Sequence, residues 1–470
     1  IPRSASPVLT DEQQYAVDRI CVSVTENQNN TFLLHGVTGS GKTEVFLNCI
    51  EKALEIGKTA IVLVPEISLT PQMVTRFAAR FGKKIAVLHS ALSMGERADE
   101  YKRIKSGEAR VVVGARSAIF APLKNIGVIV IDEEHETSYK AENAPTYHAR
   151  EVADFRAKQH GAAFVLASAT PSVESFYQAK QGNYQLISLT RRPTAQNLPT
   201  VAVSDMREEM KNGNRSCIGL SLQREIRKNK EQGEQTILFL NRRGFSTFVS
   251  CRSCGFVIKC KNCDVSLTYH KAKNSLTCHY CGYTIKKPEM CPNCASSYIK
   301  EFGAGTQKVE EELHSLFPDL SVIRMDVDTT SVKSSHRAIL EKFDKEKIDI
   351  LLGTQMVAKG LDFPNVTLVG VLAADQSLFV DDFRAGERTF DLITQVCGRA
   401  GRGERQGRAL IQTYMPENSV ICQAQEQDYL SFYENEIELR RQLNYPPFCD
   451  IISVLLTSIT QKSWRVPFTL

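Results

Sequence analysis

One run of glycines in the N-terminal part of the chain has the spacing of a phosphate-binding loop. It reads Gly36, Val37, Thr38, Gly39, Ser40, Gly41, Lys42 and Thr43. The run follows a short apolar stretch, residues 31–34, and opens a helical pattern near Glu44. In such loops backbone N–H groups turn toward phosphate oxygens, the lysine contacts the β and γ phosphates, and the final hydroxyl ligates Mg²⁺. The pattern therefore predicts binding of ATP or GTP with Mg²⁺, in preference to an ordinary glycine-rich turn.

Carboxylates at the end of a second apolar strand are the partners that such a loop needs. Residues 128–131 are all Val or Ile, and Asp132, Glu133, Glu134 and His135 follow them directly. Doubly wound sheets bind their ligands at the carboxyl ends of their strands. We expect Asp132 to hold Mg²⁺ and Glu133 to orient and deprotonate the attacking water. Without the phosphate-binding loop, an acidic helix start would be the better interpretation.

Two arginines in the C-terminal part are candidates to complete the nucleotide site. Gln395, Arg399 and Arg402 have the i, i+4, i+7 spacing that places side chains on one face of a helix. Such arginines can reach the γ-phosphate from a second lobe and act as arginine fingers when the lobes close. The alternative is that Arg399 or Arg402 forms ion pairs within its own lobe.

Eight of the 14 cysteines form four Cys-x2-Cys pairs. They are Cys251 and Cys254, Cys260 and Cys263, Cys278 and Cys281, and Cys291 and Cys294. Eight thiolates suit two tetrahedral Zn²⁺ ions, and an iron–sulfur cluster is the alternative. The span from Cys254 to Cys260 is tight for two pairs that face one ion, whereas the loop from Cys263 to Cys278 is comfortable. We therefore predict that the second and third pairs share one ion, and the first and fourth pairs the other.

The elements that position these residues follow from the alternation of apolar and helical stretches. Apolar, β-branched runs occur at residues 31–34, 60–64, 85–88, 110–113, 128–131 and 164–166, and again at 236–240, 321–325, 349–352, 366–371 and 409–413. This alternation predicts βαβ units and parallel sheets that are covered on both faces. We expect two α/β lobes joined near residues 191–213, where Pro193 and Pro199 weaken the periodicity.

Composition excludes several other classes of protein. The chain has 470 residues, of which 42% are hydrophobic and 24% charged, so collagen-like and wholly disordered classes are excluded. The formal net charge of +5 is too small to indicate a nucleic-acid binder. Apolar runs are far shorter than the ~20 residues of a bilayer span, so we expect no membrane partner. The chain opens with Ile1 and lacks a signal-peptide pattern, which indicates an internal fragment of an unexported protein.

The motifs occur in the order typical of superfamily 2 helicases. They comprise residues 36–43, 132–135, 168–171 (Ser-Ala-Thr-Pro) and 395–402. Residues 63–72, 113–122 and 353–364 are similar to the DNA-side motifs of the PriA family of bacterial replication-restart helicases. The resemblance spans nearly the whole chain. It implies two RecA-like P-loop lobes of the α/β class, with a zinc-binding module inserted in the second lobe.

The resemblance and the apolar pattern together divide the chain into expected segments. They are lobe 1 at 1–190, a linker and the start of lobe 2 at 191–235, the first strand of lobe 2 at 236–250, the two-zinc module at 251–300, the rest of lobe 2 at 301–435, and a truncated C-terminal domain at 436–470. The DNA-binding region that the family carries before its motor is not visible in this chain.

The resemblance also implies an activity and further site residues. A PriA-type protein is an ATP-driven DNA helicase that moves 3′ to 5′ and acts on forked DNA. Gln13 matches the adenine reader of the family. The loop after His135 matches an aromatic-rich loop that contacts DNA, with Tyr139, Lys140, Tyr147 and Arg150 as candidates, although tyrosines that pack on the lobe are an equal alternative.

Cofactors and partners follow in the same way. The resemblance implies ATP, Mg²⁺ and two Zn²⁺ ions as cofactors. It implies single-stranded and forked DNA, single-stranded DNA-binding protein and primosome proteins as partners, in the bacterial cytoplasm near the nucleoid.

Two other functions fit part of the pattern. One is a zinc-dependent DNA-binding scaffold for primosome assembly whose ATPase is dispensable. The other is a different superfamily 2 motor that acts on DNA or RNA. The cysteine insertion favours the PriA type over its relatives, and the intact Lys42, Asp132, Glu133 and Arg402 argue against a pure scaffold.

Overall fold

The computed structural model describes residues 7–66, 71–193, 198–241, 248–262, 266–279, 281–301, 305–326, 335–354, 357, 363–380, 382–401 and 405–452. Cys263, Arg402 and the predicted DNA-side positions 67–70 and 358–362 lie outside these ranges. No helix in the described ranges is long and apolar enough to cross a membrane.

Lobe 1 is built on a seven-stranded parallel sheet with the strand order β3-β4-β2-β5-β6-β1-β7. The strands are β1 (Thr31–Gly36), β2 (Thr59–Leu63), β3 (Ile85–Leu88), β4 (Val111–Gly114), β5 (Ile126–Asp132), β6 (Ala163–Ser168) and β7 (Gln185–Leu189). The helices are α1 (Asp11–Thr25), α2 (Lys42–Glu55), α3 (Pro71–Phe81), α4 (Met94–Ser106), α5 (Ala149–His160) and α6 (Val173–Lys180).

Strand alternation sends neighbouring residues of this sheet to opposite faces, as expected for a side-chain period of two. In β5, Val128 and Val130 pack with α1, α2 and α3, whereas Ile129 and Ile131 pack with α4, α5 and α6. Helix starts are set by local chemistry. Capping boxes formed by Thr10 with Gln13 and by Ser93 with Glu96 begin α1 and α4.

Lobe 2 has a six-stranded parallel sheet with the order β15-β16-β9-β17-β18-β8. Its strands are β8 (Thr200–Asp205), β9 (Gln235–Leu240), β15 (Val322–Met325), β16 (Ile350–Gly353), β17 (Val366–Leu372) and β18 (Arg408–Thr413). The helices are α7 (Met206–Lys211), α8 (Leu220–Glu231), α9 (Thr306–Leu316), α10 (Ser335–Lys345), α11 (Ala385–Cys397), α12 (Ser419–Glu426) and α13 (Tyr429–Gln442).

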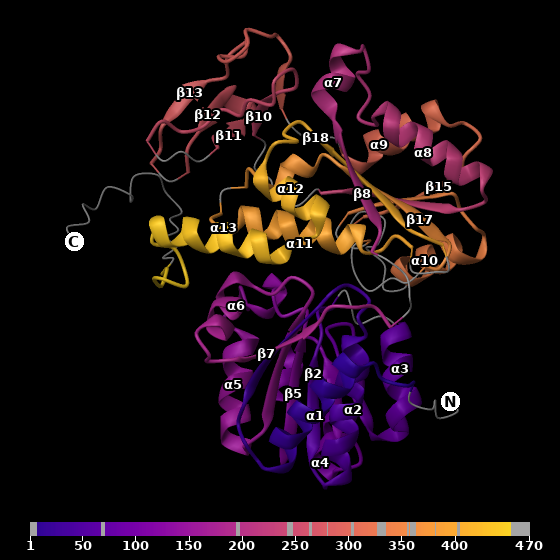
Figure 1. The fold of residues 1–470 in the computed structure, drawn as a ribbon, viewed down its shortest axis with the longest axis vertical. Helices are drawn as coiled ribbons and strands as arrows, with labels where there is room; N and C mark the ends of the chain where they lie inside the picture. Colours follow the sequence, from indigo (N-terminus) through magenta and orange to yellow (C-terminus); the bar gives the residue numbers. More distant parts are fainter. Residues whose placement is uncertain are drawn as a thin grey trace, which may run out of the picture.

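The cysteine-rich segment forms a small antiparallel module that projects from lobe 2 (Figure 1). It comprises β10 (Val249–Cys251), β11 (Thr268–His270), β12 (Ser275–Thr277), β13 (Thr284–Lys286) and β14 (Ile299–Glu301). β10 pairs with β14, and β11, β12 and β13 form a second sheet. The Ser266 hydroxyl donates to the Phe379 carbonyl at 2.7 Å and ties the module to lobe 2. The predicted two-lobed α/β architecture with a cysteine module on the second lobe is confirmed.

Two strands of the lobe sheets were not predicted from the apolar pattern. β7 and β8 are the edge strands of their sheets, and three of the five residues of β7 and five of the six residues of β8 are partly or fully exposed. Neither therefore carries the continuous apolar run of a central strand. β8 lies within the stretch at 191–213 that we expected to join the lobes. The expected boundary at residue 436 falls inside α13.

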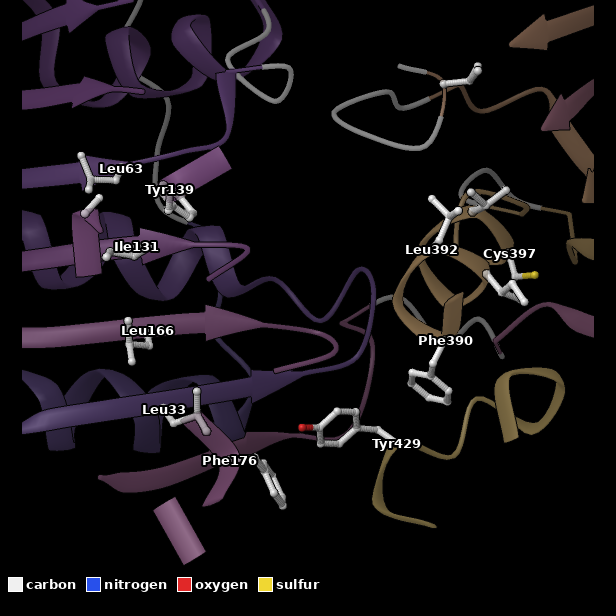
Figure 2. Close-up of a cluster of buried hydrophobic side chains, with 14 of the residues drawn as sticks. Leu33, Leu63, Ile131, Tyr139, Leu166, Phe176, Phe390, Leu392, Cys397 and Tyr429 are labelled. Carbon is white, nitrogen blue, oxygen red and sulfur yellow. The ribbon is translucent and has the colours of Figure 1, made fainter. Parts of the chain in front are cut away.

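The lobes meet along α11 and α13, which lie at the side of lobe 2 that faces lobe 1 (Figure 1). One buried hydrophobic cluster contains residues from both lobes, and Figure 2 shows Phe176 of lobe 1 close to Tyr429 of α13. Their ring centroids are 5.1 Å apart with the rings nearly perpendicular. The Tyr429 hydroxyl also donates to the carbonyl of Pro171 in lobe 1 at 2.7 Å. The lobes are therefore in contact at the N-terminal half of α6.

Candidate nucleotide site and cysteine centres

The phosphate-binding loop connects β1 to α2, as its spacing predicted. Gly39 and Gly41 both have a φ of +82°, in the left-handed region that side chains other than glycine rarely adopt. Gly41 is the N-cap of α2, so the N–H groups of the first helical turn face the loop. The Lys42 ammonium donates to the carbonyl of Gly36 at 2.6 Å. The loop has the backbone and the cation that a phosphate site needs.

Two side chains outside the motif brace this loop. The Gln13 amide nitrogen donates to the carbonyl of Ser40 at 2.8 Å, and the Arg192 Nε donates to the carbonyl of Thr38 at 2.9 Å. Gln13 is only 3% exposed, and its amide oxygen accepts from the backbone N–H of Thr10. Gln13 therefore supports the loop directly, and its contact with adenine stays a prediction. Arg192 was missed because it lies in a stretch without periodicity.

Asp132 and Glu133 lie where β5 ends, beside the loop. Burial and the negative charge of Glu133 raise the pKa of Asp132 to about 7, and the Lys42 ammonium opposes this shift. Glu133 has a φ of +47°, a left-handed conformation that is rare for a side chain of this size. Backbone strain of this kind is concentrated at functional sites. A buried carboxylate that lacks a full counter-charge is a suitable ligand for a divalent cation.

His135 connects both lobes. Its Nδ1 lies 2.7 Å from the Ser168 hydroxyl oxygen at the end of β6, and its Nε2 lies 2.7 Å from the Gln395 amide nitrogen on α11. An amide nitrogen can only donate, so the neutral imidazole accepts at Nε2 and donates from Nδ1 to Ser168. His135 and Gln395 are both buried. No role for either residue was predicted, and the only signal was their membership in the two motifs.

Glu134 also has a role that the motif did not reveal. Its carboxylate accepts from the Ser172 N–H at 2.6 Å and from the Ser175 hydroxyl at 2.9 Å. Arg150 donates to Ser175 at 2.8 Å and to Glu134 at 3.3 Å. Glu134 thus anchors the start of α6, where helix N–H groups favour a carboxylate.

The expected helix face does not extend from Gln395 to Arg399. Helix α11 ends at Cys397, and the N–H groups of Arg399 and Ala400 bond three residues back, as in a tightened final turn. Arg402 lies outside the described residues. The turn nevertheless reaches the phosphate-binding loop, because a Cβ on Gly398 would lie 2.6 Å from the Thr38 hydroxyl. Arg399 thus follows a glycine that packs directly on lobe 1.

Hydrogen bonds to lobe 1 hold the loop after His135 in place. Tyr139 is 1% exposed and its hydroxyl donates to the carbonyl of Asp132 at 2.6 Å, so Tyr139 cannot stack on bases. Arg116 donates to the carbonyls of Ser138 and Lys140. Tyr147 is half-buried beneath this guanidinium, whereas Lys140 is exposed. Of the predicted DNA-contacting side chains, Lys140 is exposed and Tyr147 and Arg150 are partly buried, with Arg150 also bonded to Glu134 and Ser175.

The cysteines form two clusters. Cys251, Cys254, Cys291 and Cys294 make one, and Cys260, Cys278 and Cys281 make the other, with all ligand atoms of each cluster within 4.8 Å of one another. Cys263 lies outside the described residues. The grouping agrees with the predicted nested pairing.

The sulfur geometry of both clusters fits zinc. The Sγ atoms of Cys251 and Cys294 are 3.6 Å apart, those of Cys254 and Cys291 3.8 Å, and those of Cys260 and Cys281 3.5 Å. Zn–S bonds of about 2.3 Å in a tetrahedron separate the sulfurs by about 3.8 Å.

Left-handed residues shape three of the cysteine pairs. Gly255, Gly282 and Ala295 each follow the second cysteine of a pair, and each has a positive φ. The N–H of each bonds back to the carbonyl of the first cysteine in its pair. This turn places both thiols of a pair on the same side of the loop. The local sequence therefore positions the two ligands that each pair contributes to a metal site.

Comparisons with known proteins agree with this geometry. Residues 10–178 match the DEAD/DEAH box helicase model, residues 298–404 the helicase conserved C-terminal domain, and residues 260–286 the PriA DNA helicase Cys-rich region. Among solved structures, RecG bound to a three-way DNA junction has a TM-score of 0.53 at 16% identity, over 93% of this chain and 53% of that one. The fold and the site define a two-lobed protein of the helicase class.

Curated relatives narrow the class to one family. Replication restart protein PriA of Bacillus subtilis (strain 168) is 56% identical over 94% of this chain and 55% of its own length. PriA of Treponema pallidum (strain Nichols) is 45% identical over 98% of this chain and 69% of its own length. The chain belongs to the PriA family of replication restart proteins. It spans about half the length of the Bacillus subtilis relative.

Proposed function

We propose that this chain is the motor of an ATP-driven DNA helicase that translocates 3′ to 5′ and acts on forked DNA in replication restart. The contact between Gln395 and His135 is the observation that supports it most strongly. This contact joins lobe 2 to the carboxylate box of lobe 1. Hydrolysis or release of the nucleotide would therefore alter the position of both lobes. Relative movement of two lobes is how such motors convert ATP turnover into translocation.

Each site residue has a proposed role. Lys42 neutralises the transferred phosphoryl group, and Glu133 orients and deprotonates water. Arg399 and Arg402 stabilise transition-state charge from lobe 2, and Gln13 reads adenine while it holds the loop. Backbone N–H groups of residues 36–43 bind the phosphates.

Mg²⁺ fits the oxygen donors at this site. Asp132 and Thr43 would hold the ion, which would supply positive charge to the phosphate oxygens when bound. The raised pKa of Asp132 agrees with a carboxylate placed to meet a cation.

Two Zn²⁺ ions fit the cysteine module, with Cys263 as the fourth ligand of the inner site. Thiolates at these distances would fix the module's fold, because the described part of its hydrophobic core is small. We propose that the module separates strands or docks partners. The partners are single-stranded and forked DNA, single-stranded DNA-binding protein and primosome proteins, in the bacterial cytoplasm near the nucleoid.

The test is ATP turnover with and without single-stranded DNA, together with strand displacement on a forked substrate. We expect DNA to stimulate ATP turnover. We also expect the protein to unwind the fork by moving 3′ to 5′ along the strand that it binds. The Lys42→Ala variant supplies the background rate. If the chain binds DNA but its ATP turnover does not change when DNA is added, the motor function is contradicted. That result would favour the alternative function of a scaffold for primosome assembly.

A further inference from the structure

A buried arginine on α13 joins segments that are far apart in the sequence. The Arg440 side chain is 1% exposed. Its Nη2 donates to Glu387 Oε2 at 2.8 Å, and its Nε donates to Glu436 Oε1 at 2.9 Å. Its Nη1 lies 3.4 Å from Glu174 Oε2. Because Glu174 is on α6 of lobe 1 and Glu387 is on α11 of lobe 2, one guanidinium bridges the two lobes.

Glu387 itself crosses the same interface. Its second carboxylate oxygen accepts from the N–H of Val173 at 2.8 Å, and Val173 is the first residue of α6. Glu134 of the carboxylate box binds the preceding N–H, that of Ser172. The start of α6 is therefore held by a carboxylate from the nucleotide site and by one from α11.

The charges at this junction depend on Arg440. Burial and the neighbouring Glu174 raise the pKa of Glu387, and the Arg440 guanidinium opposes this shift. Arg384 also pairs with Glu174, at 2.7 Å, but its side chain is 37% exposed. Arg440 is thus the buried cation of the group. Without it, Glu174, Glu387 and Glu436 would keep only the partly exposed Arg384 as a counter-charge, and carboxylates of both lobes would be left unbalanced in a region of low dielectric, which is strongly unfavourable.

Helix α11 connects this junction to the nucleotide site. Glu387 lies in its first turn and Gln395 in its last, and a helix of this length moves as one body. We infer that Arg440 is a positioning residue for ATP hydrolysis: by neutralising Glu387 and Glu174 it seats α11 on lobe 1, so that Gln395 reaches His135. The inference rests on the proposed function, because its effect on rate requires that the chain hydrolyse ATP.

The kinetic test compares Arg440→Gln with two other variants. Arg440→Lys keeps the charge but loses the guanidinium fork, and Arg441→Gln is the matched control, since Arg441 is 59% exposed and pairs within α13. We expect Arg440→Gln to lower kcat of the DNA-stimulated ATPase roughly tenfold, with the Kd of a fluorescent ATP analogue within about twofold of the parent. Arg440→Lys should recover part of kcat, and Arg441→Gln should match the parent.

A compensating variant separates positioning from general destabilisation. Adding Glu387→Gln to Arg440→Gln removes one of the three buried carboxylate charges that Arg440 balances, so folding should recover in part while kcat stays low, because the link to α11 is still missing. If Arg440→Gln does not fold, Arg384→Gln replaces it and should lower kcat less. An unchanged kcat, or a loss of nucleotide binding in proportion to rate, would overturn the inference.

A structural readout does not depend on hydrolysis. Spin labels carried by a keto amino acid at Lys102 of α4 and Lys228 of α8, both exposed, report the distance between the lobes without labelling the cysteines. We expect a broader distribution for Arg440→Gln than for the parent or Arg441→Gln. An identical distribution would overturn the inference. A parent without ATPase whose lobe distance depends on Arg440 would refute the proposed function but support the seating of α11.

Discussion

The Gln395 amide and the His135 imidazole form a hydrogen bond of 2.7 Å across the lobe interface, although 260 residues separate them in the sequence. His135 also donates to Ser168, whose hydroxyl oxygen accepts from the N–H of Thr170. The carboxylate box, the end of β6 and helix α11 therefore belong to one hydrogen-bond network. The geometry makes His135 the central member of that network.

We expect Gln395→Ala and His135→Ala to lower kcat of the DNA-stimulated ATPase by roughly tenfold or more with little change in nucleotide affinity. The double variant should be no slower than the slower single variant, because the two residues act as one unit. Steady-state kinetics with and without DNA checks this. Gln307→Ala on the exposed side of α9 is the control, and additive losses would show that the bond does not couple the two residues.

Lys42→Ala and Glu133→Gln should each abolish ATP turnover. Lys42 faces the transferred phosphate charge, whereas Glu133 acts on water, so Glu133→Gln should still bind nucleotide and Lys42→Ala should bind it weakly. Equilibrium binding of a fluorescent ATP analogue, measured beside turnover, separates the two. Full DNA-stimulated ATPase in either variant would refute the assigned role.

Arg402→Ala should lower kcat far more than it weakens ATP binding. An arginine finger acts mainly on charge that develops in the transition state, so its loss leaves the ground-state complex nearly unchanged. Both kcat and the Kd for nucleotide are measured for Arg402→Ala, and the same two quantities are measured for Arg399→Ala. A proportional loss of binding would make Arg402 a ground-state ligand.

Replacing Cys260 and Cys263 by Ser should release one Zn²⁺ and leave the outer cluster loaded. Each ion contributes folding free energy of the order of 10 kcal/mol to its own site, by analogy with zinc-finger peptides, whereas the nucleotide site lies between the lobes. Strand displacement or partner docking should fall while much of the DNA-stimulated ATPase remains. The readouts are zinc content, ATPase and unwinding on the same protein.

The exposed Cys422 provides the control for that experiment, since Cys422→Ser should keep both ions. Two zinc ions in the double variant would overturn the ligand assignment. An equal collapse of ATPase and unwinding would show that the module supports the fold of lobe 2 and is not a separable device.

Those parts of the protein whose geometry is local could be predicted from the sequence. Gly39 and Gly41 shape the phosphate-binding loop because the conformations they need depend on a few neighbouring residues. A continuous apolar run predicts a buried strand such as β5. The Cys-x2-Cys spacing predicts the turns that bring the two thiols of each pair together. The order of these motifs was sufficient to indicate the family, which the curated relatives confirmed.

Features that depend on partners distant in the sequence could not be predicted in this way, because they arise from the packing of separate elements. The half-exposed edges β7 and β8 are strands because a neighbouring strand pairs with them. Tyr139 is buried because the carbonyl of Asp132 accepts its hydroxyl, and a sequence pattern cannot distinguish that tyrosine from one that stacks on bases. Arg440 meets carboxylates of α6 and α11 more than 50 residues away. Periodicity reports on a single helix or strand, whereas these contacts arise when separate elements pack.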